Sequence, residues 1–469
     1  MATLLVNFAP MTPIHSIRNR NLFRSCAVLF TTLFADSLHA ADAAPALTVN
    51  TGDNAWMLAS SALVLMMTAP GLILFYGGLV RNKNVLSTMM HSLVLMGLIS
   101  ALWMMFGYSL AFAEGNSFFG NPLTYLFLKG VSAAPNGDYA ATIPHQTFML
   151  FQLMFAIITP ALISGAVAER VKFSGYIIFM LLWVTLIYLP LCHMVWGKGG
   201  LFNWALGGKI PVLDFAGGTV VHISSGASAL VLAMLLGKRA GYPREPMVPH
   251  NVVYSLIGTG LLWVGWFGFN AGSALNAGGL ATSAFAATHF SAAAAALSWM
   301  FVEWLLKGKP SVLGAASGMV AGLATITPAS GFVTIPAAFC IGLAGGVLCY
   351  FAVSKLKAAL GYDDSLDVFG VHCVGSITGM LMLGFLASAD VNSAIATTFM
   401  KNGALVSLVG GSAQFVNQLI GVAFTAALGA IGTIIIFKIV DKLVGMRVDQ
   451  EEESLGLDLS QHGERGYNE

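Results

Sequence analysis

Apolar runs recur along this chain, many of them about as long as the roughly 20 residues that an α-helix needs to cross the hydrocarbon core of a membrane. Only 9% of the residues are charged, against roughly 25% in soluble domains, and 57% are hydrophobic. None of the runs alternates between apolar and polar residues as the strands of a membrane barrel do. The chain is therefore predicted to be an all-α integral membrane protein surrounded by lipid.

Eleven of these runs are predicted to be membrane-spanning helices. They cover residues 54–80, 86–113, 145–168, 173–195, 214–237, 250–270, 281–306, 311–328, 331–354, 364–388 and 409–437. With this assignment fifteen lysines and arginines fall on the side of the C-terminus, and four fall on the other side, namely Lys129, Lys198, Lys209 and Lys401. Because cytoplasmic loops carry the excess of basic residues, the C-terminus is predicted to be cytoplasmic. Losing or gaining one span would scramble this alternation, which supports the odd number.

Residues 1–43 have the pattern of a signal peptide. A basic region contains Arg18, Arg20 and Arg24, an apolar region runs from residue 27 to 34, and small residues at 40–43 offer cleavage sites. The alternative is an uncleaved additional span, for which the apolar run is too short. We therefore expect a signal peptide at 1–43, a membrane domain at 44–440 and a cytoplasmic regulatory tail at 441–469. The mature N-terminus would then be periplasmic.

Two similar motifs open the fifth and the tenth predicted spans. The first is Asp214-Phe-Ala-Gly-Gly-Thr-Val-Val-His222 and the second is Asp367-Val-Phe-Gly-Val-His372. An offset of five spans gives the two copies opposite orientations, which predicts a 5+5 inverted repeat followed by a final helix. The repeat is only approximate, because the aspartate and the histidine are eight residues apart in one copy and five in the other.

His222 and His372 are the strongest candidates for a functional site. An ionisable side chain at membrane depth is costly, so its presence there is a hypothesis of function. The alternative is a histidine that only packs between helices, which we prefer for His91, His250 and His289 taken singly. The two aspartates stand where a helix begins, and a carboxylate there can accept backbone N–H groups as a cap.

Further motifs follow one another along the chain. They are Phe151 to Phe155, Gly165 to Arg170, His193 to Gly197, Asp214 to His222 with Gly237-Lys238-Arg239, Trp266 to Ser273, Ile326 to Ala329 and Asp367 to His372. In content and order they resemble the motifs of the Amt-type ammonium transporters, over nearly the whole chain after the predicted signal peptide. The acidic segment from Glu451 to Asp458 is similar to the cytoplasmic tail of that family.

The resemblance implies an ammonium transporter of the cell inner membrane. An outer recruitment site would consist of Phe151, Phe155, Trp196 and Ser273. Phe155 and Phe269 would stack below it as a gate, and His222 and His372 would touch in an apolar pore. Asp214 would either support recruitment or deprotonation of ammonium or merely cap its helix, and both readings stay open. Asp367 is expected to be mainly structural.

The chemistry of these residues suits ammonium. Tryptophan is the best cation–π partner, and a serine hydroxyl can accept one of the four N–H bonds. Two adjacent imidazolium ions would repel one another in a low dielectric, so at most one ring of the pair should be charged. A neutral pair can pass hydrogen bonds along an apolar path, or relay a proton, without a fixed charge.

The resemblance also implies a homotrimer and a PII-type signal protein as a partner of the cytoplasmic tail. No enzyme activity, cofactor, metal site or nucleic-acid partner is expected, and the cysteines lack metal-ligand spacing. Two other functions are considered: a Rh-like channel for neutral gases, and an ammonium sensor. The sequence leaves open whether transport carries charge and which route the proton takes.

Overall fold

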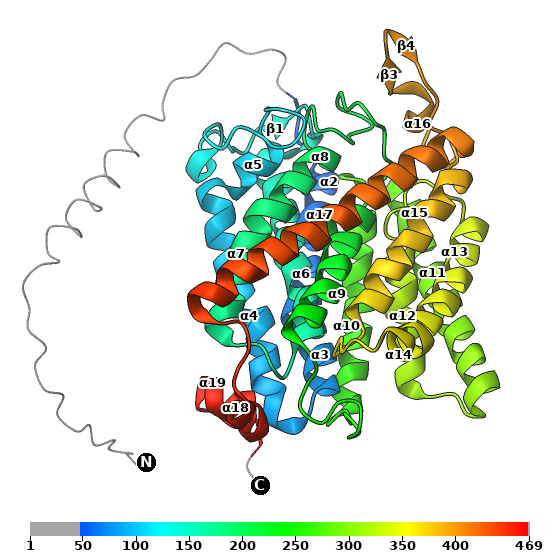
Figure 1. The fold of residues 1–469 in the computed structure, drawn as a ribbon. Helices are drawn as coiled ribbons and strands as arrows, with labels where there is room; N and C mark the ends of the chain where they lie inside the picture. The colour runs from blue at the N-terminus through cyan, green and yellow to red at the C-terminus, as the bar shows by residue number, and fades with distance from the viewer. Residues whose placement is uncertain (1–46, 468–469) are drawn as a thin grey trace, which may run out of the picture. The chain divides into compact units, whose positions relative to one another are not determined.

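The computed structural model describes residues 47–467, and the predicted signal peptide lies outside them. Within this part the chain is mostly helical (Figure 1). Ten of its helical segments are long and apolar enough to cross a membrane, and the shorter apolar helix α12 (Val312–Ile326) adds an eleventh. The predicted eleven-helix membrane architecture is confirmed.

The first five spans contain the following elements. Span one consists of α2 (Thr51–Met66), η1 (Met67–Leu72) and α3 (Ile73–Leu79). Span two consists of η2 (Asn82–Asn84), α4 (Val85–Leu102), η3 (Trp103–Gly107) and α5 (Tyr108–Phe112). Span three is α6 (His145–Val167), and span four consists of α7 (Phe173–Trp183), η5 (Val184–Tyr188) and α8 (Leu189–Trp196). Span five consists of η6 (Gly218–Ile223) and α9 (Ser224–Leu236).

The remaining spans follow in the same way. Spans six, seven and eight are α10 (Val252–Gly272), α11 (Gly279–Lys307) and α12. Span nine consists of α13 (Ile335–Phe351), η7 (Ala352–Leu356) and α14 (Lys357–Leu360), and span ten of η8 (Phe369–Cys373) and α15 (Val374–Leu386). Span eleven is α17 (Ser412–Val444).

Short elements occupy the connections between spans and the C-terminal segment. Between spans two and three lie η4 (Leu126–Leu128) and the antiparallel pair β1 (Pro135–Asn136) and β2 (Ala140–Pro144). Before α17 lie α16 (Ala394–Thr397) and the pair β3 (Met400–Lys401) and β4 (Ala404–Leu405). After it come α18 (Gln450–Leu455) and α19 (Leu457–His462).

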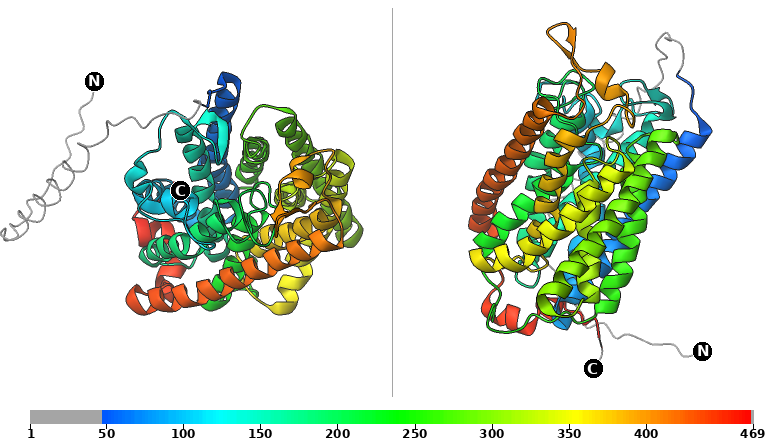
Figure 2. Two further views of the ribbon diagram at one scale, coloured as in Figure 1. Left: turned by 90° about the horizontal axis from the view of Figure 1, so that it is seen from above. Right: turned by 90° about the vertical axis from the view of Figure 1, so that its right-hand side faces the viewer.

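The helices differ strongly in how far they are enclosed. The apolar stretch of α6 is 94% buried, whereas that of α17 is 33% buried. Figures 1 and 2 show α17 running obliquely across the outside of the bundle, where it packs on α9 and α15. The third span is therefore a central helix, and side chains on it are well placed to line an internal path.

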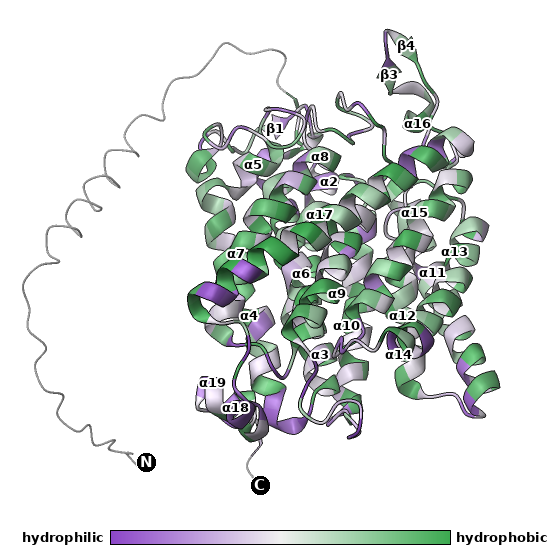
Figure 3. Ribbon diagram, viewed as in Figure 1, coloured by the Kyte–Doolittle hydropathy of each residue, from purple (hydrophilic) through white to green (hydrophobic). Residues whose placement is uncertain are grey.

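Hydrophilic residues gather toward two opposite ends of the bundle (Figure 3). One end carries α18 and α19, and we call it the tail end. There α19 packs against η2, α4 and α18. The other end carries the β1–β2 hairpin, and we call it the hairpin end (Figure 1).

Spans five and ten begin later than predicted. They start at Gly218 and Phe369, not at residues 214 and 364. The predicted starts lie in irregular segments that hold the capping aspartates described below, so the hydrophobic pattern begins before the helix does.

Candidate functional site

The two predicted pore histidines lie side by side inside the bundle. His222 belongs to η6 and His372 to η8, and their Nδ1 atoms are 3.3 Å apart. The rings are nearly parallel, with centroids 5.2 Å apart and 13° between the ring planes. The two residues are 1% and 4% exposed. The fold therefore brings together two side chains that are 150 residues apart in the sequence.

A hydrogen bond between two Nδ1 atoms restricts how this pair can hold protons. One Nδ1 must bear a proton and the other must be free of one, since the bond needs one donor and one acceptor. In a neutral pair, the ring that donates through Nδ1 leaves its Nε2 as an acceptor, whereas the other ring carries its proton on Nε2. The pair then presents an acceptor at one end and a donor at the other, with no net charge. Nε2 of His222 is buried and has no hydrogen-bond partner within residues 47–467.

The backbone at both histidines permits this close approach. Each histidine lies in a π-helical turn at the start of its span, and such turns are frequent at functional sites. Gly217, just before the first turn, has a φ of 112°, a conformation that favours glycine. Gly226 on α9 faces Cys373, and a Cβ at Gly226 would lie only 2.7 Å from the Cys373 backbone nitrogen. A larger residue at Gly226 would force η8, which carries His372, away from α9.

Asp214 caps the fifth span. Its carboxylate accepts hydrogen bonds from the backbone N–H groups of Gly217, Gly218 and Thr219 at 2.8, 2.6 and 2.7 Å, and from the Thr219 hydroxyl. Asp214 is 2% exposed, and its backbone carbonyl accepts a hydrogen bond from Nε1 of Trp196 at 3.1 Å. The contacts are those of a helix cap that also positions Trp196. A part of Asp214 in recruiting or deprotonating ammonium stays a prediction.

The residue that caps the tenth span is Asp364, not Asp367. Oδ2 of Asp364 accepts a hydrogen bond from the Phe369 backbone N–H at 2.8 Å. The carboxylate of Asp367 instead forms an ion pair with Nζ of Lys357 at 2.7 Å. Asp364 precedes His372 by eight residues, as Asp214 precedes His222. The inverted repeat is therefore more regular than the sequence motifs indicated.

Aromatic rings connect Trp196 to the histidine pair. Phe155 on α6 meets Trp196 edge-on, with ring centroids 5.9 Å apart, and stacks on Phe269 of α10 at 4.2 Å. Phe269 in turn lies 6.0 Å from the ring of His222. Phe155 and Phe269 are 1% and 0% exposed, so their stack closes the way between Trp196 and the histidines in this conformation.

Three cavities follow one another through the bundle. At the hairpin end a cavity of about 280 Å³ is lined by Phe155, Trp196 and Ser273, among others. Beyond the Phe155–Phe269 stack lies a space of only about 10 Å³, lined by both histidines and apolar side chains. A cavity of about 300 Å³ on the tail side of His372 also reaches Asp367. The narrowest and most apolar part of this path is therefore the part that contains the histidine pair.

Ser273 and Phe151, the other two members of the predicted recruitment site, differ in their access to the hairpin-end cavity. Among the described residues, Ser273 lines this cavity and Phe151 does not. Oγ of Ser273 donates a hydrogen bond to the Phe269 carbonyl at 2.8 Å, which leaves the hydroxyl oxygen able to accept one. Phe151 is 0% exposed and packs behind Phe155, with ring centroids 5.0 Å apart. It is absent from the lining of the hairpin-end cavity in the part of the chain that the structure describes. Its geometry is that of a support for Phe155.

Trp266 is a neighbour of the pair that the sequence reasoning missed. Its ring stacks on His222, with centroids 5.4 Å apart and 19° between the planes, and its Nε1 donates a hydrogen bond to the Thr327 hydroxyl at 2.9 Å. The signal was available, since Trp266 opens the motif that contains Phe269 and the two are three residues apart on one helix.

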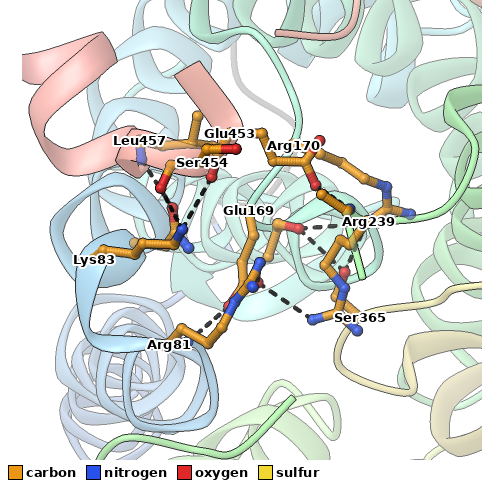
Figure 4. A network of polar contacts seen from close by, with 12 residues as sticks. Arg81, Lys83, Glu169, Arg170, Arg239, Ser365, Glu453, Ser454 and Leu457 are labelled. Atoms are coloured by element: carbon orange, nitrogen blue, oxygen red, sulfur yellow. Dashed lines mark hydrogen bonds and ion pairs between the residues drawn. The ribbon is translucent and has the colours of Figure 1, made fainter. Parts of the chain in front are cut away.

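A polar network holds the loops together at the tail end (Figure 4). Glu169, 1% exposed, accepts hydrogen bonds from the backbone and side chain of Arg81, each at 2.7 Å, and lies 3.6 Å from Arg239. Arg239 forms a two-pronged pair with Asp363, at 2.9 and 2.8 Å. Arg170 is fully buried and donates to the Ser365 hydroxyl at 2.7 Å. Buried charged side chains in these loops are thus satisfied by ion pairs or, for Arg170, by hydrogen bonds to neutral groups.

The C-terminal segment docks on these loops. Glu453 of α18 accepts hydrogen bonds from the backbone N–H of Ala240 at 2.6 Å and from Arg447 at 2.8 Å. Lys83 donates to the Ser454 carbonyl at 2.6 Å (Figure 4). The Leu457 N–H donates to the side chain of Asn84 at 2.8 Å. The tail therefore connects the start of span two with the loop after span five.

Comparisons with known proteins agree with this arrangement. The profile of the Ammonium Transporter Family matches residues 55–467. An ammonium transporter of Bacillus subtilis is 48% identical over 418 residues, which is 89% of this chain and 99% of that protein. A crystal structure of Candida albicans Mep2 superposes with a TM-score of 0.78 at 35% identity, covering 90% of this chain and 91% of that one. A structure titled Sensor Amt Protein gives a TM-score of 0.77 at 27% identity, covering 88% and 98%. With the family profile matched over nearly all of the described residues, the chain belongs to the ammonium transporter family.

Proposed function

We propose that this chain takes up ammonium by capturing the cation at the hairpin end and passing ammonia through the histidine-lined constriction. Ammonium would bind beside Trp196 and Ser273 and lose a proton near the Phe155–Phe269 stack. Ammonia would then pass His222 and His372, the shed proton would cross through the hydrogen bond of the histidine pair, and the two would recombine in the tail-side cavity, so that one positive charge crosses with each ammonia. The observation that carries the proposal is the Nδ1–Nδ1 contact of a buried histidine pair inside the narrow apolar cavity.

The physical argument rests on the cost of moving a charge. An ion leaving water for a low-dielectric interior loses several kcal/mol of solvation even after the protein relaxes. The constriction offers no carboxylate to offset this cost, because its lining consists of the two histidines and apolar side chains. Ammonium avoids the cost by shedding a proton, whereas potassium cannot. The uncharged ends of the pair can still accept from and donate to ammonia.

In the cell, we place the hairpin end in the periplasm and the tail end in the cytoplasm of the inner membrane. The signal peptide predicted at 1–43 and the basic residues of the tail-end loops support this orientation. We further propose a homotrimer. His289 is exposed on the outside of α11, about 15 Å along the helix from its start, and contact with another copy would remove it from lipid.

The docked tail supports a regulatory role for residues 441–469, with a PII-type signal protein as the expected partner. The segment contacts the loop after span five, which borders the tail-side cavity, so a protein that binds the tail could reach the exit of the path.

The test is the current of the reconstituted protein under a potassium gradient, with and without ammonium. His222→Asp places a carboxylate in the constriction and should let potassium pass. His222→Ala removes the relay without adding charge and should lose the ammonium current. If His222→Asp stays closed to potassium and His222→Ala carries ammonium at the normal rate, the histidine pair does not determine selectivity.

Measurements on the wild-type protein also distinguish this transporter from a gas channel and from a sensor. A Rh-like channel for neutral gases would move ammonia with no current when ammonium is added. The structural likeness to the Sensor Amt Protein favours a sensor as the second candidate. A sensor would bind ammonium with little or no sustained flux, which a flux assay in the same vesicles would reveal.

A further inference from the structure

The hairpin-end cavity extends from Trp196 outward to an acidic side chain at its mouth. Asp138 lines this cavity and lies between β1 and β2. Tyr139, the next residue, stacks on Phe148 of α6 with centroids 5.0 Å apart and donates a hydrogen bond to the Phe112 carbonyl at 2.7 Å. The hairpin is thereby fixed over the entrance, and Asp138 has a defined position relative to Trp196.

Lys198 already forms an ion pair with the carboxylate of Asp138 at this mouth. Nζ of Lys198 lies 3.1 Å from Asp138 and 3.8 Å from Glu114. The hydrogen bond and charge of Asp138 raise the pKa of Lys198 above its ordinary value, so the amine stays charged throughout the physiological range. The Lys198 backbone N–H donates to the Tyr139 hydroxyl at 3.0 Å, which holds the lysine two residues beyond Trp196. The head of this side chain is an alkylammonium group and is chemically close to ammonium itself.

A second side chain in the same cavity lacks a partner. Gln152 on α6 lines the cavity, is 9% exposed, and its Oε1 has no hydrogen-bond partner within residues 47–467. A buried acceptor without a hydrogen-bond partner is unfavourable, and a bound donor would remove this cost. Gln152 precedes Phe155 by three residues on the same helix, so it stands between the mouth and the aromatic gate. Its free carbonyl oxygen suits a ligand that donates N–H bonds.

We propose that Asp138, Glu114 and Gln152 form an outer cation station on the way to Trp196, and that Lys198 competes with ammonium for it. The inference rests on the proposed direction of transport. In the resting state, Lys198 satisfies Asp138 and lowers the negative potential of the mouth. An arriving ammonium ion displaces the lysine head from Asp138, then transfers a hydrogen bond to Gln152 and continues toward Trp196. Lys198 thus sets the affinity for ammonium without touching the pore.

The decisive measurement is the half-saturation concentration of the ammonium current in proteoliposomes at low and high ionic strength. Lys198→Gln should lower it about five-fold at about 10 mM salt, the Boltzmann factor of one unit charge about 4 Å from another in water. The effect should shrink to less than about two-fold near 1 M salt, where the screening length is about 3 Å. Lys198→Arg keeps the charge and serves as the matched control with an unchanged value.

A double mutant identifies the partner of the lysine. Asp138→Asn should raise the half-saturation concentration at low salt, because it removes the carboxylate for which ammonium and Lys198 compete. In the Asp138→Asn background the benefit of Lys198→Gln should shrink. Gln152→Met should raise the half-saturation concentration at both salt concentrations, since it removes a neutral acceptor. The competition is refuted if wild type and Lys198→Gln have the same half-saturation concentration at low salt. It is also refuted if Lys198→Gln lowers the half-saturation concentration as much in the Asp138→Asn background as in the wild type. A wild-type value for Gln152→Met overturns the role of Gln152.

A binding readout separates this inference from the proposed transport. With lysines labelled by ¹³C-dimethylation, the Lys198 signal, assigned by its loss in Lys198→Arg, reports the pKa of that amine. Ammonium at the station should lower this pKa, and the same concentration of sodium should do so far less. If the wild type carries no ammonium flux yet shows this shift, the transport proposal fails and the station stands. If flux is normal and the signal responds equally to both cations, the station fails alone.

Discussion

Truncating Glu453 to alanine should release the C-terminal segment from the loops. The side chain is 2% exposed and accepts hydrogen bonds from the Ala240 N–H and from Arg447. A hydrogen bond to a charged group contributes about 1.5–3 kcal/mol. Because Arg447 is 34% exposed, its bond is weakened by solvent screening. The docked state should therefore lose about 2–3 kcal/mol, which raises the open fraction roughly 30- to 150-fold.

Hydrogen exchange of the tail amides measures this opening. The Leu457 N–H donates to Asn84 only while the tail is docked, so its exchange rate should rise by the same factor. Glu451→Ala is the matched control, because it removes the same charge from the same short helix at an exposed side chain. It should change the rate only slightly, through the helix dipole. If both variants exchange alike, the buried contacts of Glu453 do not hold the tail.

Three further outcomes are expected. Trp196→Leu should raise the half-saturation concentration of the ammonium current roughly 2- to 30-fold, the range of a cation–π contact of about 0.5–2 kcal/mol, and leave the thermal stability in detergent close to wild type. Burial raises the pKa of Asp364 from 3.8 to about 6, against the opposing charge of Lys357, so the folded state favours the protonated carboxyl. The melting temperature of the wild type relative to Asp364→Asn should thus be highest below pH 3.8 and fall as the pH rises through about 6, and a constant difference would contradict this. Deleting residues 450–469 should abolish the response to a PII-type protein while potassium stays excluded, and binding of that protein to the truncated chain would refute the tail as its docking site.

The spans and the aromatic and histidine motifs could be predicted because each is a local pattern. Apolar length identifies a span, and a histidine inside a span is conspicuous. Asp364 could not be assigned in this way. Asp363, Asp364 and Asp367 all precede the tenth span, and only the backbone decides which carboxylate faces the helix start.

Other features of the site and of the tail depend on contacts between residues that are far apart in the sequence. Phe151 is part of the recognised motif, yet its position behind Phe155 follows from how α6 packs on α10. The docking of Glu453 on Ala240 joins residues 213 positions apart. The π-helical turns at His222 and His372 have no propensity signal of their own, since one extra residue in a turn is imposed by packing.

The matching caps of spans five and ten bear on the direction of flow. Asp214 and Asp364 each hold the start of a half-path that ends at a histidine, and the two half-paths enter from opposite faces of the membrane. A core built from two equivalent halves has no intrinsic preference for import over export. Passage of ammonia through the histidine pair should therefore run in the opposite direction when the ammonium gradient is reversed. Any rectification has to come from the two unlike mouths, with aromatic and acidic groups at the hairpin end and a chamber lined by ion-paired loops at the tail end. Vesicles that hold the protein in a single orientation, loaded and then diluted, should therefore empty as readily as they fill once both mouths are saturated.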